Sequence, residues 1–331
     1  MTTKIAGRRR PLGGGSQKSW FSPGKGGSAG QISLRTGIKR HWQIYILVLP
    51  AVLYTVVFAY GPLYGLVLAF KDYRPYLGYL ESPFVGWKHF IRFFRSNKFE
   101  QVIANTLILS FYQLLAGFPL PIILALCLNY IPSRPFKKLV QNITYAPYFV
   151  STVVVVSMLS IFFSQSTGMV NNIREALGLG RRLYMGSPTA FRHMYVWSGV
   201  WQSMGWNSII YFAGLSSVDE TLHEAARVDG ASIFQRILYV DLPMLKPTIV
   251  TLFILNTGKL MSVGFEKAYL MQNSLNIGAS EIISTYVYSI GMLEQQYSYS
   301  TAINLFNSVI NLIMVLTVNY ISQKLSETSI W

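Results

Sequence analysis

The stretch EAARVDGASIFQRILYVDLPMLKP, Glu224–Pro247, places a short charged segment, a glycine and a Leu-Pro pair between two apolar runs. The whole chain of 331 residues is 51% apolar, 15% aromatic and only 12% charged. Soluble domains carry roughly 25% charged residues. Because a chain that crosses a bilayer must satisfy its backbone polar groups internally, long apolar runs predict helices. The composition therefore predicts an all-α polytopic membrane protein, in which the quoted stretch connects two spans.

The first 41 residues differ in composition from the rest of the chain. They contain nine Lys or Arg and no acidic residue, and they are rich in Gly, Ser and Pro. Such a segment buries too little apolar surface to fold alone, so we expect 1–41 to be a disordered basic tail. Its charge favours a cytoplasmic N-terminus beside anionic lipid. A nucleic-acid-binding arm is the alternative, although no folded reader module accompanies the tail.

Six apolar runs in residues 42–331 are long enough to cross a bilayer, so we expect one transmembrane domain. They lie at about residues 43–69, 102–130, 140–163, 194–217, 248–266 and 300–322. A cytoplasmic N-terminus places the loops 131–139 and 218–247, and the C-terminus, in the cytoplasm. The basic residues of 131–139 support this orientation, whereas those between the first two runs oppose it. The sequence thus predicts a multi-pass protein with both termini in the cytoplasm.

The segment 218–247 contains signals for a first short helix. Ser217 and Glu220 have the spacing of a capping box, which predicts a helix that starts as the fourth run ends. Helical spacing gives this helix a small apolar stripe. The stripe consists of Leu222, Ala225 and Ala226. A rigid and partly charged helix of this kind fits the role of a docking knob for a soluble partner.

A bend and a second amphipathic segment follow. Gly230 is expected to break the first helix, and apolar residues at helical spacing resume at Ile233. Pro243 is predicted to end this segment, because proline lacks the amide N–H that a helix interior requires. Pro247 is predicted to open the fifth span in its first turn. The expected order is helix, bend, helix and span.

The spacing within this segment matches a known signature. The signature is Glu-Ala-Ala, three residues, Gly, nine residues, an aliphatic residue, any residue, then Leu-Pro. Glu224-Ala225-Ala226, Gly230, Val240 and Leu242-Pro243 fit it. The chain therefore resembles the permease subunits of binding-protein-dependent ATP-binding-cassette (ABC) importers. The alternative is an ordinary amphipathic loop at the membrane interface.

The resemblance implies a type I ABC importer permease fold in which this segment is a coupling element for an ATPase subunit. Ala225 and Ala226 would permit close approach to a groove on the ATPase. Glu224 would pair with a basic group there, and Gly230 would make the bend. Asp229 agrees with the common Asp-Gly form of the signature, which Leu242 and Pro243 complete.

Two further segments resemble a narrower group. They are VLPAVLYTVVFAYGPLYGLVLAFKDY in the first run and residues 282–331. Both are similar to lipoprotein-assisted permeases for polysaccharides and oligosaccharides, including alginate importers of the bacterial cytoplasmic (inner) membrane. The resemblance implies a second homologous permease, two copies of an ATP-binding subunit and an extracytoplasmic saccharide-binding protein. The chain has no G-x-x-x-x-G-K-[ST] pattern, so ATP and Mg²⁺ are expected on the separate ATPase, with no cofactor on this chain.

A saccharide path needs polar groups for hydroxyls and aromatic faces for C–H surfaces. The candidates are Trp201, Gln202, Asn207, Tyr211, Asn256, Lys259 and Glu266. Lys259 should lie about 18 Å into the fifth span, near the middle of a core roughly 30 Å thick. A cation there is costly unless it faces a wet cavity or a counter-ion. Lys259 would attract an acidic saccharide such as a uronate oligomer; pairing with an acid and snorkelling to an interface are the alternatives.

Other residue groups give weaker indications. The tyrosines at 286, 288, 297 and 299 fit an aromatic belt, with sugar stacking as the alternative. The histidines at 41, 89, 193 and 223 lack metal-ligand spacing, and no nucleophile-base arrangement is evident, so neither a metal site nor an enzyme is expected. An ion-coupled secondary transporter that uses Lys259 or Glu266 is the alternative function. A membrane-embedded enzyme is a further one.

Overall fold

The computed structural model describes residues 42–326, so the predicted tail at 1–41 lies outside the described residues. The chain divides into two compact units, one ending at Leu63 and the other beginning at Tyr64. In the first unit, α2 (Trp42–Thr55) leads into a π-type turn, Val56–Tyr60, and a 3-10 segment, Gly61–Phe70, continues into the second unit. None of the residues of α2 is buried.

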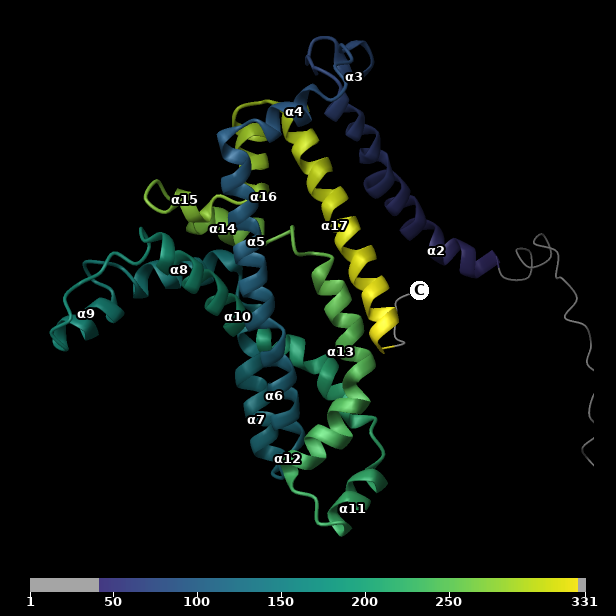
Figure 1. Cartoon of the computed structure of the whole chain (residues 1–331), viewed down its shortest axis with the longest axis vertical. Helices are drawn as coiled ribbons and strands as arrows, with labels where there is room; N and C mark the ends of the chain where they lie inside the picture. Colours follow the sequence, from purple (N-terminus) through teal and green to yellow (C-terminus); the bar gives the residue numbers. More distant parts are fainter. Residues whose placement is uncertain (1–41, 327–331) are drawn as a thin grey trace, which may run out of the picture. The chain divides into compact units, whose positions relative to one another are not determined.

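The second unit consists of helices and the loops between them (Figure 1). The first helices are α3 (Gly78–Glu81), α4 (Lys88–Phe94), α5 (Asn97–Gly117), α6 (Pro119–Asn129), α7 (Arg134–Tyr145), the 3-10 turn η3 (Ala146–Phe149), α8 (Thr152–Phe162), α9 (Met169–Ala176) and α10 (Pro188–Ser216). The next are α11 (Glu220–Val228), α12 (Ile233–Arg236), the π-type turn η4 (Ile237–Asp241), α13 (Leu242–Thr257), α14 (Phe265–Met271), α15 (Ile277–Ser280), α16 (Ile283–Tyr288), the π-type turn η5 (Ser289–Leu293) and α17 (Tyr297–Ser326). Within residues 42–326 the only β pairing is one isolated bridge, Lys71 to Phe84.

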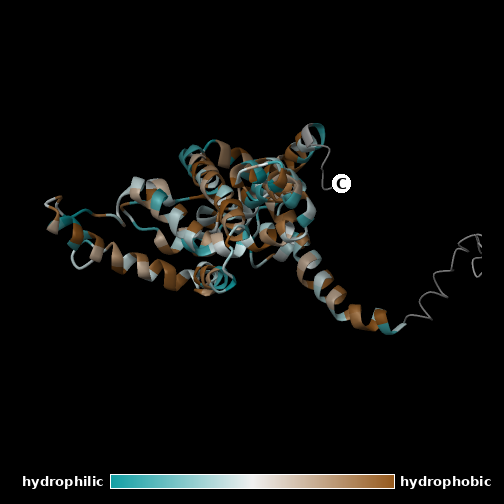
Figure 2. Cartoon of the chain, turned by 90° about the horizontal axis from the view of Figure 1, so that it is seen from below, coloured by the Kyte–Doolittle hydropathy of each residue, from teal (hydrophilic) through white to brown (hydrophobic). Residues whose placement is uncertain are grey.

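Four helical segments are long and apolar enough to cross a membrane. They are Trp42–Phe70, Asn97–Asn129, Ile233–Thr257 and Tyr297–Lys324. Hydrophobic residues, coloured brown in Figure 2, occupy long stretches of the helices. A bent pair raises the number of spans to at most five. Six spans therefore remain a prediction.

The predicted continuous span at 140–163 is wrong. The helical segments Arg134–Phe149 and Thr152–Phe162 meet at 98°. Between them, Val150 and Ser151 have extended backbone, and the Ser151 side chain accepts a hydrogen bond from the backbone N–H of Val154. A serine cap begins a new helix, so the chain turns here instead of continuing straight.

The predicted fifth span ends earlier than expected, because α13 ends at Thr257 rather than near 266. Gly258 donates its backbone N–H to the carbonyl oxygen of Ile254 and closes the helix. A Cβ at Gly258 would come within 2.3 Å of Val315 Cγ2 on α17. Lys259 therefore lies in a turn after the helix, and not in the middle of a continuous span.

The long helix α10 is the centre of the second unit. It contacts α5, α6, α7, α13, α14 and α15. At Gly205 its backbone approaches α7 so closely that an added Cβ would lie 2.0 Å from the carbonyl oxygen of Thr144. Only glycine leaves room for this crossing. The close approach sets the position of the side chains that α10 presents on its other faces.

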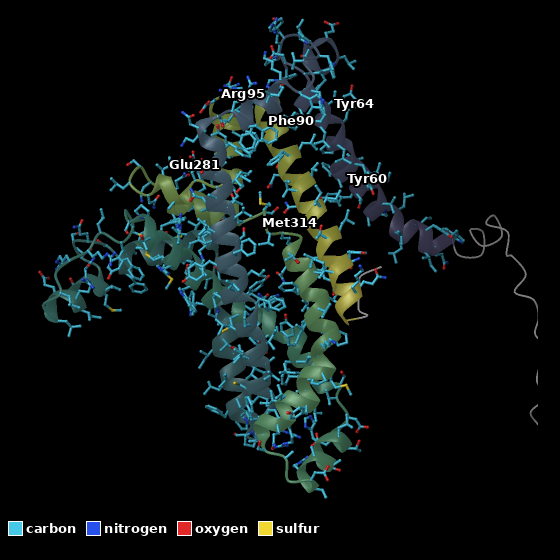
Figure 3. The ribbon with its side chains drawn as sticks, in the orientation of Figure 1. Tyr60, Tyr64, Phe90, Arg95, Glu281 and Met314 are labelled. Carbon is cyan, nitrogen blue, oxygen red and sulfur yellow. The ribbon has the colours of Figure 1, made fainter. Side chains whose placement is uncertain are left out.

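Polar links join α5 to the segment before α16. Lys98 pairs with Glu281 at 2.6 Å between Nζ and Oε2. The Asn105 amide donates to the carbonyl oxygens of Gly278 and Glu281, and Arg192 on α10 donates to the Asn105 side chain at 3.2 Å. Glu281 is labelled in Figure 3. Because these partners lie mostly out of water, the links fix the two segments against each other.

Candidate functional site

The segment predicted to be a coupling element, residues 218–247, begins differently from the expected capping box. Asp219 is the N-cap of α11, and its carboxylate accepts the backbone N–H of Thr221 at 3.0 Å, which lowers the pKa of Asp219. Ser217 instead donates its hydroxyl to the carbonyl oxygen of Gly214. Because α10 continues to Ser216, Ser217 belongs to the end of that helix, and the predicted Ser217–Glu220 box is wrong.

The outer face of α11 is open to solvent. Glu224 and Ala225 are exposed, Ala226 is half-buried, and Val228 is 87% exposed. Figure 1 shows α11 and α12 at one end of the second unit, with α4 at the opposite end. A smooth apolar surface beside a free carboxylate suits a complementary groove on another protein.

A complete helix-ending motif produces the bend after α11. Gly230 has φ +77°, a conformation that side chains with a Cβ rarely adopt. The backbone N–H of Gly230 donates to the carbonyl oxygen of Arg227, and the N–H of Ala231 donates to the carbonyl oxygen of Ala226. This is the Schellman arrangement, in which two free carbonyl groups of a helix end are satisfied. Gly230 therefore has the predicted place in the bend, next to the C-cap Asp229.

The predicted helix end at Pro243 and span start at Pro247 are both wrong. Helical structure continues from Ile233 to Thr257, with Leu242 and Pro243 in the first turn of α13 and Pro247 inside it. The π-type turn η4 changes the backbone hydrogen-bonding pattern just before Pro243. A proline in the first turn of a helix costs little, because its missing N–H has no essential partner there.

Sequence reasoning missed a buried polar cluster under the coupling element. Asp241 on η4 has no exposed surface. The Tyr130 hydroxyl donates to its Oδ2 at 2.7 Å, and His223 Nε2 lies 3.3 Å from its Oδ1. The Arg236 guanidinium lies over the Tyr130 ring, 5.3 Å from its centre. Asp241 occupies the unspecified position of the signature, so the motif gives no indication of it.

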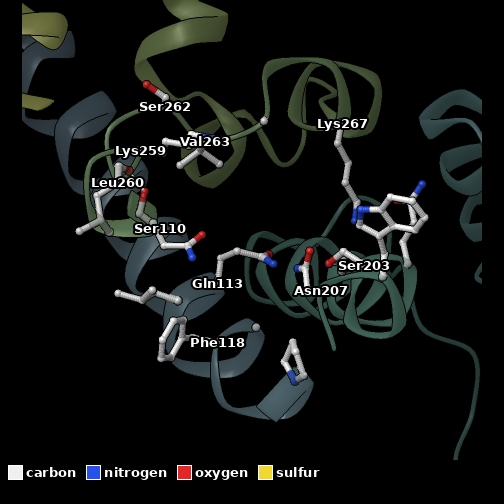
Figure 4. A pocket seen from close by; sticks show the side chains of 18 of the residues that line it. Ser110, Gln113, Phe118, Ser203, Asn207, Lys259, Leu260, Ser262, Val263 and Lys267 are labelled. Atoms are coloured by element: carbon white, nitrogen blue, oxygen red, sulfur yellow. Dashed lines mark hydrogen bonds between the residues drawn. The ribbon is translucent and has the colours of Figure 1, made fainter. Parts of the chain in front are cut away.

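A cavity of about 740 Å³ lies among α5, α6, α10, α13, the turn after α13 and α14 (Figure 4). Its lining includes six of the seven predicted path residues: Gln202, Asn207, Tyr211, Asn256, Lys259 and Glu266. Trp201 is 48% exposed and does not line it. Helical periodicity turns Trp201 away, because it is adjacent to Gln202 and points about 100° from it. The sequence prediction missed Gln113, Ser203, Trp206 and Lys267, which come from α5, α10 and α14.

Lys267 is the most buried cation of the cavity lining, with 8% of its surface exposed. Its Nζ donates to the carbonyl oxygen of Tyr195 at 2.9 Å and lies 5.2 Å from the centre of that ring. Within the described chain no carboxylate lies within 4.0 Å of it. A Cβ at Gly199 would come within 3.3 Å of Lys267 Nζ and of Gln113 Oε1. Glycine at this position therefore leaves space for both polar groups.

Lys259 and Glu266 are exposed and belong to none of the ion pairs between residues 42 and 326. Figure 4 shows Lys259 and Lys267 on separate segments around the cavity, with Gln113 and Asn207 between them in this view. The cavity thus offers two ammonium groups, one carboxylate, several amides and aromatic faces. These groups suit a ligand with hydroxyls, C–H faces and negative charge.

The other candidate groups have structural partners. His89 Nε2 lies 3.1 Å from the carbonyl oxygen of Lys71, and His193 is hydrogen-bonded to Tyr112; His41 lies outside the described residues. No cluster of three or more His, Cys, Asp or Glu suited to a metal occurs among residues 42–326. The aromatic-belt prediction is wrong for Tyr286 and Tyr299, which are buried in the core because helical packing turns them inward.

Residues 117–327 match the family model of the binding-protein-dependent transport system inner membrane component. The chain belongs to this family. This inner membrane component is 40% identical to protein LplB of Bacillus subtilis (strain 168), over 91% of this chain and 94% of the relative. It is 39% identical to the polygalacturonan/rhamnogalacturonan transport system permease protein YteP of the same organism, over 87% and 90%.

A solved structure shares the fold of this inner membrane component. It is a chain in the crystal structure of a bacterial alginate ABC transporter in complex with an alginate pentasaccharide-bound periplasmic protein. The two chains are 38% identical, with a TM-score of 0.83, over 90% of this chain and 99% of the other. The predicted all-α permease fold of type I ABC importers is therefore confirmed.

Substitution of Gly230 in this inner membrane component tests the bend. Gly230→Val should loosen the connection between α11 and α12, because a β-branched residue at positive φ costs at least about 1–2 kcal/mol. Faster amide hydrogen exchange over residues 226–232 is expected. Gly230→Asn is the matched control, since asparagine tolerates this conformation, and it should exchange nearly as slowly as the wild type. Equal amide hydrogen-exchange rates in the Gly230→Val variant and the wild type would contradict the claim that Gly230 holds the bend between α11 and α12.

Proposed function

We propose that this chain is the transmembrane subunit of an ATP-driven importer that translocates a polysaccharide or oligosaccharide. The observation that carries the proposal is the cavity lined by amides, aromatic rings and two lysines. The names of two relatives support it, because one concerns polygalacturonan and rhamnogalacturonan transport and the other alginate. The ion-coupled alternative draws no support from membership of a binding-protein-dependent family.

The cavity chemistry favours an acidic saccharide. Lys267 is nearly buried without a carboxylate partner in the described chain, and Lys259 is free to reach into the same space. A buried ammonium group without a counter-ion is costly unless water or a bound anion compensates it. A uronate carboxylate would supply that compensation, while Gln113 and Asn207 would bond to sugar hydroxyls. Trp206 and Phe265 would offer apolar faces to the ring.

The coupling element is proposed to face the cytoplasm, together with both termini, and to dock on a separate ATPase. ATP and Mg²⁺ would be used there, and this chain would carry out no chemistry. Ala225 and Ala226 would permit close approach, while the exposed Glu224 would pair with a basic group on the ATPase. Closure of two ATPase subunits would pull the element inward and swing the spans from inward-facing to outward-facing. A second homologous permease would complete the pore, and an extracytoplasmic binding protein would deliver the saccharide.

Glu224→Gln tests the coupling role in the complex reconstituted with its permease partner, ATPase and binding protein. Loss of a charged interfacial pair should reduce saccharide-stimulated ATP hydrolysis roughly tenfold, equivalent to about 1.4 kcal/mol. Glu100→Gln, which removes an exposed carboxylate at the start of α5, should leave stimulation at the wild-type level. Wild-type stimulation in a Glu224→Gln complex would contradict the assignment of this residue.

Lys267→Met and Lys259→Gln test the charge of the path. Each should raise the uronate oligosaccharide concentration needed for half-maximal stimulation by roughly tenfold, because one attractive charge is lost. The response to a neutral oligosaccharide should change little. Lys138→Gln, an exposed lysine outside the cavity lining, is the control. An equal rise in the half-maximal concentration for the uronate and the neutral saccharide would show that the lysines support the fold and do not select charge.

A further inference from the structure

Asp241 is a fully buried carboxylate at the junction of three segments. It lies on η4, between the coupling helix α11 and the span that continues into α13. Its partners come from elsewhere in the sequence: Tyr130 caps the end of α6, and His223 belongs to α11. One side chain therefore contacts the coupling helix and the end of a different transmembrane segment.

The two oxygens of the Asp241 carboxylate differ: Oδ2 is hydrogen-bonded, whereas Oδ1 has a polar neighbour but no hydrogen-bond partner among the described residues. Oδ2 accepts the Tyr130 hydroxyl at 2.7 Å, while Oδ1 lies 3.3 Å from His223 Nε2. The His223 and Tyr130 rings meet edge to face, with centres 6.4 Å apart. Arg236, the last residue of α12, places its guanidinium over the Tyr130 ring and adds positive charge to the cluster. A carboxylate removed from water is stable only with such partners.

The cluster continues to the surface of α11. Arg227 donates from Nε to the carbonyl oxygen of His223 at 3.2 Å and pairs with Glu220 at 2.7 Å. The buried face of α11 in this region is formed by His223, whereas Glu224 and Val228 face outward. The polar contact through His223 is therefore well placed to hold α11 against the body of the second unit.

We propose that Asp241 is a positioning residue that fastens the coupling helix to the end of α6, so that α11, η4 and α6 move as one body. The inference rests on the proposed function, since it assigns to this cluster the transfer of ATPase motion to the spans. Motion imposed on the exposed face of α11 would pass through His223 and Asp241 to Tyr130. Without this link, α11 would pivot at Gly230, and the helices that line the cavity would not move with it.

The test uses a spin label at Val228, whose side chain is 87% exposed. The chain has a single cysteine, Cys127, so Cys127→Ser with Val228→Cys gives one labelling site. In the assembled complex, Asp241→Asn should increase the mobile component of the label spectrum and reduce saccharide-stimulated ATP hydrolysis roughly tenfold. Basal hydrolysis should remain, because the ATPase itself is unchanged. His223→Gln should act in the same direction, and the double variant should add nothing further.

Two tyrosine substitutions separate the link from a general loss of packing. Tyr130→Phe removes only the hydroxyl bonded to Asp241 and should increase label mobility, whereas the exposed Tyr320→Phe should not. Unchanged mobility in Asp241→Asn and Tyr130→Phe, or additive effects of Asp241→Asn and His223→Gln, would overturn the proposal. If Asp241→Asn fails to assemble, His223→Gln and Tyr130→Phe decide the question. A wild-type complex without saccharide stimulation would refute the proposed function, while the label spectra would still decide whether the link exists.

Discussion

The contact between Gly205 and the Thr144 carbonyl group fixes the course of α10, on which the rest of the second unit depends. Because α10 passes this close to α7, its polar face lies beside α5, α6 and α14 and forms one wall of the cavity. Its C-terminal end at Ser216 then leads directly into the coupling element. The crossing at Gly205 is thus one constraint on the place of both candidate sites.

The cavity and the coupling element differ in how their buried charges are partnered. In the cavity, Lys267 contacts one carbonyl oxygen and one ring but no carboxylate in the described chain, which leaves positive charge available to a ligand. Below the coupling element, Asp241 accepts a hydrogen bond from Tyr130 and lies 3.3 Å from His223 Nε2. An available charge suits transient binding, whereas a buried carboxylate held between two neighbouring side chains suits a fixed mechanical connection. This contrast supports a path in the first case and a link in the second.

Local sequence patterns predicted the helical class and the place of Gly230, because glycine at a helix end has a specific backbone role. Six predicted path residues line one cavity because they lie on α10, α13, the turn after α13 and α14, which surround it. Lys267 and Asp241 escaped prediction, since their importance depends on contacts with Tyr195 and Tyr130, which are remote in sequence. The errors at Pro243 and at 140–163 share a cause: π-type turns and extended linkers depend on tertiary packing more than on residue preference.

The most direct test of the importer account is uptake of a labelled uronate oligosaccharide into proteoliposomes that contain the permease pair, the ATPase and the binding protein. Uptake should require ATP on the ATPase side and should persist when ionophores collapse proton and sodium gradients. Non-hydrolysable nucleotide should abolish it, because the cycle needs repeated opening and closing of the ATPase. Uptake that continues without ATP and stops when the ion gradients collapse would contradict the account.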